Sequence, residues 1–403
     1  MKTVASILIA VSLAAGAFAL DARRLARPQD TVPASFFGMH IHRLAEGTAW
    51  PNVPFETWRL WDARVSWPQL EPKKGEWKFE LLDSYVKSAE EHRVEVLLPL
   101  GPCPQWASSR PAEPSSYQPG NAAPPQNMQD WRDYVRTIGL RYQGRIRTYE
   151  IWNEPNLPGF FTGTMPQMIE LTRVAREVLR EIDPSIRIVS PAATEAGGIQ
   201  WLDQFLAQGG GQYVDVIGYH LYVDPAPPEQ MVNRIDDIRA VLARRKLRLP
   251  IWNTEAGWAH PKPFPSEDMA AAYVARAYVL SWAAGVSRFY WYAWDNHGWV
   301  SLQMTDSAGR PEAPAAAYSE INRWLTGRRV EECKSDAGDN WVCSLSGSSA
   351  RQWIVWNARR SAAFSLPRDW KVSEVRDLAG RERKISGASL QIGVSPQLLE
   401  AAP

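Results

Sequence analysis

The chain has 403 residues, which is enough for a large barrel domain and a smaller second domain. Its 45 lysines and arginines nearly balance its 44 aspartates and glutamates, so composition argues against nucleic acid or an anionic membrane surface as a partner. The 20 tryptophans are unusually many. They either fill a core or, in part, line a cleft in which flat apolar rings meet the C–H faces of sugars.

The N-terminus is typical of a secretion signal. Lys2 precedes an apolar run from Val4 to Leu20, and Ala17-Phe18-Ala19 is a small-x-small cleavage site. We expect residues 1–19 to be removed, which predicts an exported protein in the periplasm or outside the cell. The alternative is an uncleaved membrane anchor, because the run reaches the short end of the lengths that span a bilayer. We expect no strong membrane binding beyond this segment.

Eight short β-prone runs follow along the chain, and helical patterns separate most of them. The runs are 35–42, 57–61, 94–101, 146–153, 186–193, 214–222, 250–255 and 287–294. The clearest amphipathic helical patterns are 81–92, 165–182, 230–246 and 266–284. This alternation predicts an α/β fold, a (β/α)8 TIM barrel over residues 20–327. The crossover at 44–55 carries two prolines, and we expect a loop or a poor helix there.

After residue 327 the pattern changes to short alternating runs with polar turns between them. The runs are 341–345, 352–357, 363–366, 371–377, 390–394 and 397–399. They predict a small C-terminal β-sandwich over 328–403, which either covers the barrel or binds sugar. Cys333 and Cys343 flank the turn residues of an expected hairpin, so they form either a disulfide or two reduced core thiols.

Two glutamates end two of the β-prone runs of the barrel. Glu154 ends Tyr149-Glu150-Ile151-Trp152-Asn153-Glu154, and Glu255 ends Ile251-Trp252-Asn253-Thr254-Glu255. Glycoside hydrolysis needs such a pair, because one carboxyl protonates the leaving oxygen while the other attacks or stabilises the anomeric carbon.

Several strings together resemble one group of enzymes. Trp152-Asn153-Glu154-Pro155-Asn156, with Glu255 at a second strand end, resembles clan A of the (β/α)8 retaining glycoside hydrolases. Trp67-x-x-Leu70-Glu71-Pro72-x-x-Gly75-x-Trp77 and Pro104-x-Trp106-Ala107 agree with that clan. Within it, the chain is most similar to glycoside hydrolase family 39 and related bacterial exopolysaccharide hydrolases. The resemblance implies a retaining enzyme that cleaves a β-linked polysaccharide or oligosaccharide by double displacement, without a cofactor.

The resemblance also implies roles for the two glutamates and their neighbour Asn153. Glu154 is expected to be the general acid and then the base, and Glu255 the nucleophile. Retention requires the two carboxyls about 5–5.5 Å apart. Repulsion from Glu255 is expected to keep the proton on Glu154. Asn153 is expected to bind the sugar 2-hydroxyl, or else to stabilise a turn, and a bulge would let it face the site together with Glu154.

Four further polar residues are expected to surround the glutamates. Arg59 is expected beside Glu255, and its alternative partner is the deeper Glu150. Tyr222 is expected to hold the nucleophile. His220 lies two residues before it, hence on the same face, and is either functional or a structural histidine. We interpret His40 as a substrate-binding residue and expect no metal site, because no third ligand accompanies His40 and His42.

Tryptophans near strand ends are candidates for sugar binding. Trp294 is the first candidate for the platform under the reacting sugar, with Trp291 as its rival. Trp61, Trp106 and Trp258 are expected at further subsites, and each could equally be barrel packing. Two alternatives to the main hypothesis remain: an exo-acting glycosidase or transglycosylase on the same site, and a non-catalytic carbohydrate-binding barrel.

Overall fold

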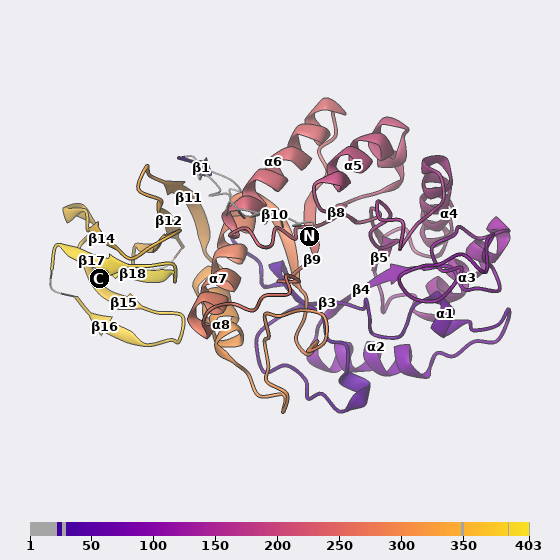
Figure 1. Cartoon of the computed structure of the whole chain (residues 1–403), viewed down its shortest axis with the longest axis horizontal. Helices are drawn as coiled ribbons and strands as arrows, with labels where there is room; N and C mark the ends of the chain where they lie inside the picture. Colours follow the sequence, from indigo (N-terminus) through magenta and orange to yellow (C-terminus); the bar gives the residue numbers. More distant parts are fainter. Residues whose placement is uncertain (1–21, 26–29, 348–349, 386, 403) are drawn as a thin grey trace, which may run out of the picture.

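The computed structural model describes residues 22–25, 30–347, 350–385 and 387–402. The expected signal peptide, residues 1–19, lies outside them. Figure 1 shows two bodies side by side: a curved parallel sheet with helices around it, and a smaller antiparallel sheet next to α7 and α8. None of the helices described is both long enough and apolar enough to cross a membrane.

The larger body is the predicted (β/α)8 barrel, and each of the eight expected runs contains a strand. These strands are β2 (Phe37–Met39), β3 (Thr57–Arg59), β4 (Glu95–Leu100), β5 (Thr148–Ile151), β6 (Arg187–Val189), β7 (Ala193–Thr194), β8 (Ile217–His220), β9 (Ile251–Ala256) and β10 (Val286–Trp291). Their order is β6-β5-β4-β3-β2-β10-β9-β8-β7. The fifth run is divided, so that β6 pairs with β5 while β7 pairs with β8. Because β6 and β7 follow one another in the chain, this division closes the sheet.

Helices cover the outside of the barrel (Figure 1). They are α1 (Trp67–Leu70), α2 (Glu80–His92), α3 (Met128–Arg141), α4 (Met165–Ile182), α5 (Gly197–Ala207), α6 (Glu229–Arg244), α7 (Glu267–Ala283) and α8 (Ala313–Leu325). The expected helical patterns correspond to α2, α4, α6 and α7. The first crossover contains only the short 3-10 turn Leu44–Glu46, as its prolines predict.

The smaller body is a seven-stranded antiparallel sheet with a two-stranded sheet against it. The large sheet has the order β1-β11-β12-β13-β18-β15-β16, and the small one pairs β14 with β17. Their bounds are β1 (Arg24–Leu25), β11 (Arg329–Ser335), β12 (Asn340–Ser346), β13 (Gln352–Asn357), β14 (Ala362–Ser365), β15 (Val372–Arg376), β16 (Glu382–Lys384), β17 (Ser389–Ile392) and β18 (Gln397–Ala401). The two sheets share a core that includes Trp353, Val375 and Leu390. A disulfide joins Cys333 of β11 to Cys343 of β12.

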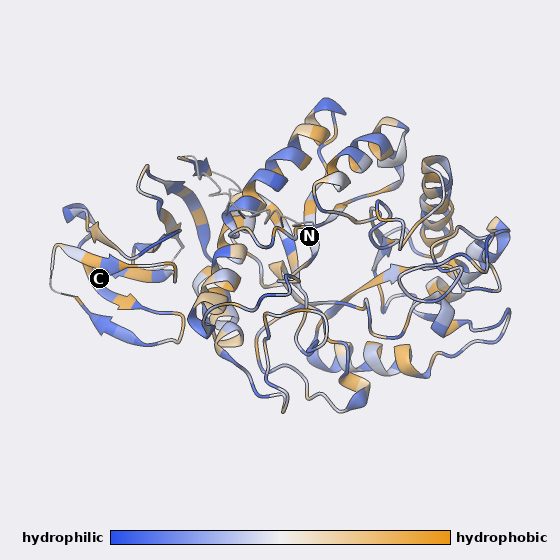
Figure 2. Cartoon of the chain, in the orientation of Figure 1, coloured by the Kyte–Doolittle hydropathy of each residue, from blue (hydrophilic) through white to orange (hydrophobic). Residues whose placement is uncertain are grey.

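In both bodies, exposed elements are polar and buried elements are largely apolar. Figure 2 shows β16, at the free edge of the large antiparallel sheet, as hydrophilic. Its residues Glu382–Lys384 are exposed, and charge on an edge strand hinders pairing with other chains. The opposite case is α7, which is buried on nearly all sides from Ala270 to Ala283. A helix that is apolar all round belongs inside a protein, and α7 lies between the barrel and the antiparallel sheet (Figure 1).

A buried ion pair between two helices of the barrel also contacts the antiparallel sheet. The carboxylate of Glu229, at the start of α6, accepts hydrogen bonds from the guanidinium of Arg276 on α7. The same carboxylate accepts a hydrogen bond of 3.0 Å from the indole N–H of Trp356 on β13. The barrel and the antiparallel sheet therefore meet through a polar contact that is closed off from water.

Candidate active site

The chain turns sharply where β5 ends. Trp152 and Glu154 have φ angles of 68° and 45°, in the left-handed region that non-glycine residues rarely adopt. Glu154 N donates to Ala192 O at 2.9 Å, which holds the turned segment against the next strand. We expected a bulge to bring Asn153 and Glu154 to the same cleft. Two left-handed residues accomplish this instead, and both side chains line the cleft.

The two predicted catalytic glutamates face each other across this cleft. One carboxylate oxygen of Glu154, one of Glu255 and a ring nitrogen of His220 all lie within 4.8 Å of one another. The cleft has a volume of about 760 Å³, and residues just beyond the ends of the barrel strands line it. It therefore lies at the C-terminal end of the barrel, where enzymes of this fold carry their active sites.

Glu255 is held at both of its oxygens. Arg59 Nη1 donates to Oε2 at 2.7 Å, and the Tyr222 hydroxyl donates to Oε1 at 3.1 Å. The same guanidinium contacts Glu150 and donates to Asn153 Oδ1 at 2.8 Å. Arg59 therefore serves both partners considered from the sequence, the deeper Glu150 and the cleft residue Glu255.

Glu154 has a different partner. Its Oε1 lies 2.8 Å from His220 Nδ1, and His220 is fully buried. Burial lowers the pKa of His220 to about 4, although the charge of Glu255 opposes this. The imidazole is therefore neutral near pH 7, and it does not supply Glu154 with a positive charge.

Burial sets the protonation of both carboxyls. It raises the pKa of Glu154 to about 7, against the opposing charge of Arg59. It raises the pKa of Glu255 to about 7 as well, against the charge of Arg59. We expected repulsion from Glu255 to be the main cause at Glu154, but burial is the largest cause and Glu255 is not among the causes. Because Arg59 and Tyr222 both donate directly to Glu255, we assign the negative charge of the pair to Glu255 and the proton to Glu154.

Aromatic rings form two walls of the cleft. On one wall, Tyr117 contacts both Trp61 and Phe160 edge to face. On the other, Trp299 contacts Tyr222 and Tyr292 in the same manner. Tyr117 and Trp299 are 47% and 54% exposed, so they form the rim of the cleft, whereas Trp61 and Tyr292 are buried deeper.

Seven residues that we expected to bind substrate lie outside the lining of this cleft. Two of them, Arg59 and His220, contact the glutamate pair, and the other five pack around the site. Trp291 is fully buried against Tyr273 and Phe289, and Trp294 is buried in the same core. The indole of Trp106 donates to Glu71 O, and that of Trp258 donates to Lys262 O.

His40 is the fifth of these residues. It is buried and bonded to Thr254 O at 3.1 Å. Like the four tryptophans, it packs beneath or beside the cleft, and the assignment of these five residues to substrate contacts stays a prediction.

Tyr292 lines the cleft, whereas Trp291 and Trp294 do not. Strand residues alternate between faces, and Tyr290 points into the barrel interior with Leu97 and Trp252. Tyr292, two residues later, therefore faces the cleft, while Trp291 faces the helices. Counting this alternation from the sequence would have identified it. Other lining residues that we did not predict are Asp62, Glu195, Asp224, Arg234 and Asn296.

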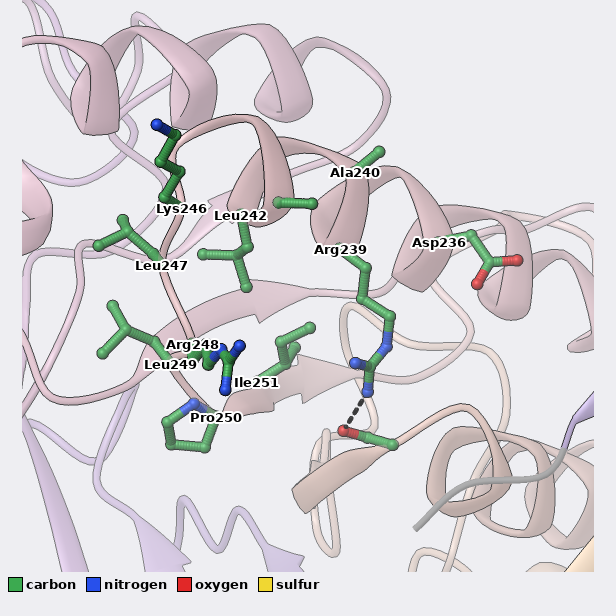
Figure 3. A pocket seen from close by; sticks show the side chains of 12 residues that line it. Asp236, Arg239, Ala240, Leu242, Lys246, Leu247, Arg248, Leu249, Pro250 and Ile251 are labelled. Atoms are coloured by element: carbon green, nitrogen blue, oxygen red, sulfur yellow. Dashed lines mark hydrogen bonds between the residues drawn. The ribbon is translucent and has the colours of Figure 1, made fainter.

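A second hollow lies at the opposite end of the barrel (Figure 3). It has a volume of about 1020 Å³ and is bordered by the end of α6 and the starts of β9 and β10. Figure 3 shows a hydrogen bond donated by the guanidinium of Arg239. Its acceptor is the carbonyl of Gly285. Asp236 is the one carboxylate in its lining and pairs with Arg23. This hollow lacks the pair of carboxyls that marks the cleft above the strand ends.

Glu154, His220 and Glu255 together are also a geometric candidate for a metal site. However, Arg59 already places a positive charge on Glu255. We therefore keep the prediction that the site works without a metal ion.

Comparisons with known proteins agree with this geometry. A family model described as glycosyl hydrolases family 39 matches residues 69–292, more than half of the chain. A beta-xylosidase from Geobacillus stearothermophilus is 26% identical over 229 residues, which cover 50% of this chain and 45% of that protein. The chain therefore matches less than half the length of this curated relative.

Solved structures share the fold. A family 39 glycoside hydrolase from Bacteroides cellulosilyticus has a TM-score of 0.73 at 18% identity, over 92% of this chain and 81% of that one. A family 39 beta-xylosidase from Caulobacter crescentus has a TM-score of 0.68 at 17% identity, over 94% of this chain and 98% of that one.

Proposed function

Because the chain belongs to family 39 of the glycosyl hydrolases, we propose that it is a retaining glycoside hydrolase with Glu154 as acid and base and Glu255 as nucleophile. The observation that carries this proposal is the approach of the two carboxyls, which have oxygens within 4.8 Å of each other. Retaining enzymes hold these groups about 5–5.5 Å apart, whereas inverting enzymes need about 6.5–9.5 Å to place a water molecule between them.

In the first step the ionised Glu255 attacks the anomeric carbon. The bond from that carbon to the leaving oxygen breaks as a bond to the glutamate oxygen forms, and Glu154 gives its proton to the leaving oxygen. Arg59 and Tyr222 hold Glu255 in position for this attack. The burial that raises the pKa of Glu154 keeps its proton available near neutral pH.

In the second step Glu154 acts as a base. It removes a proton from water, the water oxygen attacks the anomeric carbon, and the ester bond to Glu255 breaks. Two inversions return the sugar to its starting configuration. Since the charge on Glu255 is absent while the ester exists, a negative Glu154 costs less at this stage than before.

We propose β-xylosides as the first substrates to test, with other β-linked oligosaccharides and polysaccharides next. Beta-xylosidases are among the related proteins, which supports this choice. Carbohydrate also suits a cleft with two aromatic walls, because sugars stack on such rings. We further propose that the protein is exported and cleaved after Ala19. Recovery of the mature protein from the periplasm or medium, with Leu20 at its N-terminus, tests this export.

The variant Glu154→Ala separates acid catalysis from nucleophilic attack. It should reduce hydrolysis of methyl β-xyloside at least about a hundredfold, because that leaving group needs a proton. The first step on a dinitrophenyl glycoside should survive, since this group leaves as an anion. Azide should then restore turnover and yield a glycosyl azide with the configuration of the substrate.

The control for this experiment is Glu195→Ala, which removes a different carboxylate from the cleft lining. It should show no rescue by azide. Equal losses on the activated and the unactivated substrate in Glu154→Ala would contradict the assignment of the acid.

A further inference from the structure

Positive side chains gather at the end of the barrel opposite the catalytic cleft. A basic run, Ala243-Arg244-Arg245-Lys246-Leu247-Arg248, ends α6 and leads toward β9. Lys246 and Arg248 line the hollow of about 1020 Å³ that Figure 3 shows. Short runs dense in lysine and arginine are typical of surfaces that bind polyanions. The run therefore indicates an anionic partner at a place far from the catalytic pair.

A smaller hollow of about 500 Å³ lies at the same end of the barrel. Arg147, directly before β5, and Arg187, the first residue of β6, line it. At this end the segment that begins β8 lies between β6 and β9. Neighbouring strands are about 4.8 Å apart, so the starts of β6 and β9 are about 10 Å apart. One extended chain can therefore contact cations of both hollows. We call Arg147, Arg187, Lys246 and Arg248 the basic end.

The carboxylates near the basic end already have partners. Each hollow has one carboxylate in its lining. Asp236 pairs with Arg23, and Glu95 pairs with Arg288 at 2.7 Å. Asp215, which precedes β8 between the two hollows, pairs with two arginines of α4. These anions are therefore largely neutralised, and the basic end keeps an excess of positive charge.

Three cations of the basic end are available to a ligand. Arg147, Lys246 and Arg248 are exposed, and no carboxylate of the described residues lies within ion-pair distance of them. Figure 3 shows Leu249 and Pro250 next to Arg248 in the larger hollow. The surface therefore combines unpaired positive charge with apolar side chains.

We propose that the basic end binds an acidic polysaccharide, a chain whose sugars carry carboxylates, at a site separate from the catalytic cleft. Arginine and lysine attract the carboxylates, and the apolar side chains suit the C–H faces of the sugars. Single-stranded nucleic acid is a poorer match, because the described linings of the two hollows contain no aromatic ring on which a base could stack. A membrane surface is a poorer match too, because the cations border hollows and no large apolar side chain protrudes among them.

Biolayer interferometry with the full chain and immobilised polygalacturonate tests this proposal, with dextran as the neutral polymer. Binding to polygalacturonate should be clear at about 50 mM NaCl and at least about tenfold weaker at about 500 mM, because salt screens exposed charges. Lys246→Gln combined with Arg248→Gln should weaken binding about threefold to tenfold. Both residues are exposed, so the fold should survive, and thermal unfolding checks this.

The matched control is Lys87→Gln combined with Arg381→Gln, which removes the same charge from exposed positions on α2 and before β16. It should bind as the wild-type protein does. Glu255→Gln should also keep its binding, so a failure of the proposed hydrolysis leaves this measurement intact. Absence of binding to polygalacturonate, or equal losses in the two double variants, would overturn the inference. Equal binding to dextran, or to vesicles of phosphatidylcholine and phosphatidylglycerol, would overturn it as well.

Discussion

Among the residues that the structure describes, Arg59 is the one lysine or arginine in contact with Glu150 and Glu255, and all three side chains are almost completely shielded from water. Charge–charge contacts of this kind depend on every member being present. Removing the guanidinium would leave two carboxyls buried together without a counter-charge. Arg59 is therefore expected to matter for folding as well as for the reactivity of Glu255.

We predict that Arg59→Met lowers the free energy of unfolding by about 3–5 kcal/mol at pH 8, since it leaves buried charge unpaired. The loss should be smaller at pH 5. Burial already raises the pKa of Glu255, and without Arg59 that pKa rises further. Taking up the proton that cancels the charge costs little at pH 5, close to the pKa of the unfolded chain, and costs more at pH 8.

Urea unfolding at the two pH values measures this difference. The matched control is Arg173→Met, whose ion pairs with Glu170 and Glu177 lie near the surface and are worth less than about 1 kcal/mol. A loss for Arg59→Met that does not change with pH would contradict the account.

Sequence reasoning located the polar residues of the site better than the aromatic ones. Arg59, His220 and Tyr222 contact the glutamate pair, and Asn153 accepts a hydrogen bond from Arg59 beside it. The tryptophans were harder to place, because an indole packs as readily into a core as into a cleft. Asp62 carried no signal of its own, since the two tyrosines that donate hydrogen bonds to it are 55 and 230 residues away in the chain.

Among the elements, the ends of β9 and β10 set the geometry around Glu255. Gly257 follows β9, and a Cβ atom at this position would lie 2.2 Å from Tyr292 O. The close approach of the two backbones therefore requires glycine. Glu255, which precedes this glycine, and Tyr292 both line the cleft.

We predict that Gly257→Ala lowers kcat/KM at least about tenfold, because the strand ends must separate and a displacement of about 1 Å is costly in catalysis. Gly298→Ala is the matched control, since its Cβ would meet nothing nearer than 3.9 Å. Steady-state kinetics on a nitrophenyl glycoside compares the two variants. Similar activity in both would show that this contact does not position the site.

Elements with a regular pattern of apolar residues could be predicted from the sequence. Elements that depend on packing or pairing with neighbouring elements could not. All eight barrel runs contain strands because apolar β-prone residues repeat there. We did not predict α5, which begins with the poor helix formers Gly197 and Gly198 and depends on packing through residues such as Phe205. We also missed β16, whose residues are all exposed and which pairs with β15.

At the scale of the whole molecule, Glu229 links α6, α7 and the antiparallel sheet. We predict that Glu229→Ala lowers the free energy of unfolding by about 3–5 kcal/mol, because Arg276 is then buried without a partner. Trp356→Phe should cost less, about 1 kcal/mol, since it removes one hydrogen bond and keeps most of the packing.

Denaturant unfolding measures both effects. As a control, Glu90→Ala removes a surface pair with Arg145 and should cost less than about 1 kcal/mol. An equal loss in Glu90→Ala and Glu229→Ala would contradict the role assigned to the buried contact.

The sequence predicted the two bodies, but it did not predict that an N-terminal segment pairs with a strand of the C-terminal sheet. Arg24 and Leu25 pair with β11 and so place an N-terminal segment in the C-terminal sheet. Two residues give no periodic pattern, and partners more than 300 positions away cannot be found from local propensity. The polar contact of Glu229 with Trp356 is hidden from local propensity as well, because the two residues lie 127 positions apart.

The central claim is that Glu255 forms the glycosyl ester. Incubation with a dinitrophenyl 2-deoxy-2-fluoro-β-xyloside, followed by proteolysis and mass spectrometry, tests it most directly. The fluorine slows both steps, while the good leaving group allows the first, so the ester accumulates. The account predicts one label per chain, on Glu255, and none in Glu255→Gln. A label on Glu150 or Glu154, or the same labelling in Glu255→Gln, would contradict it.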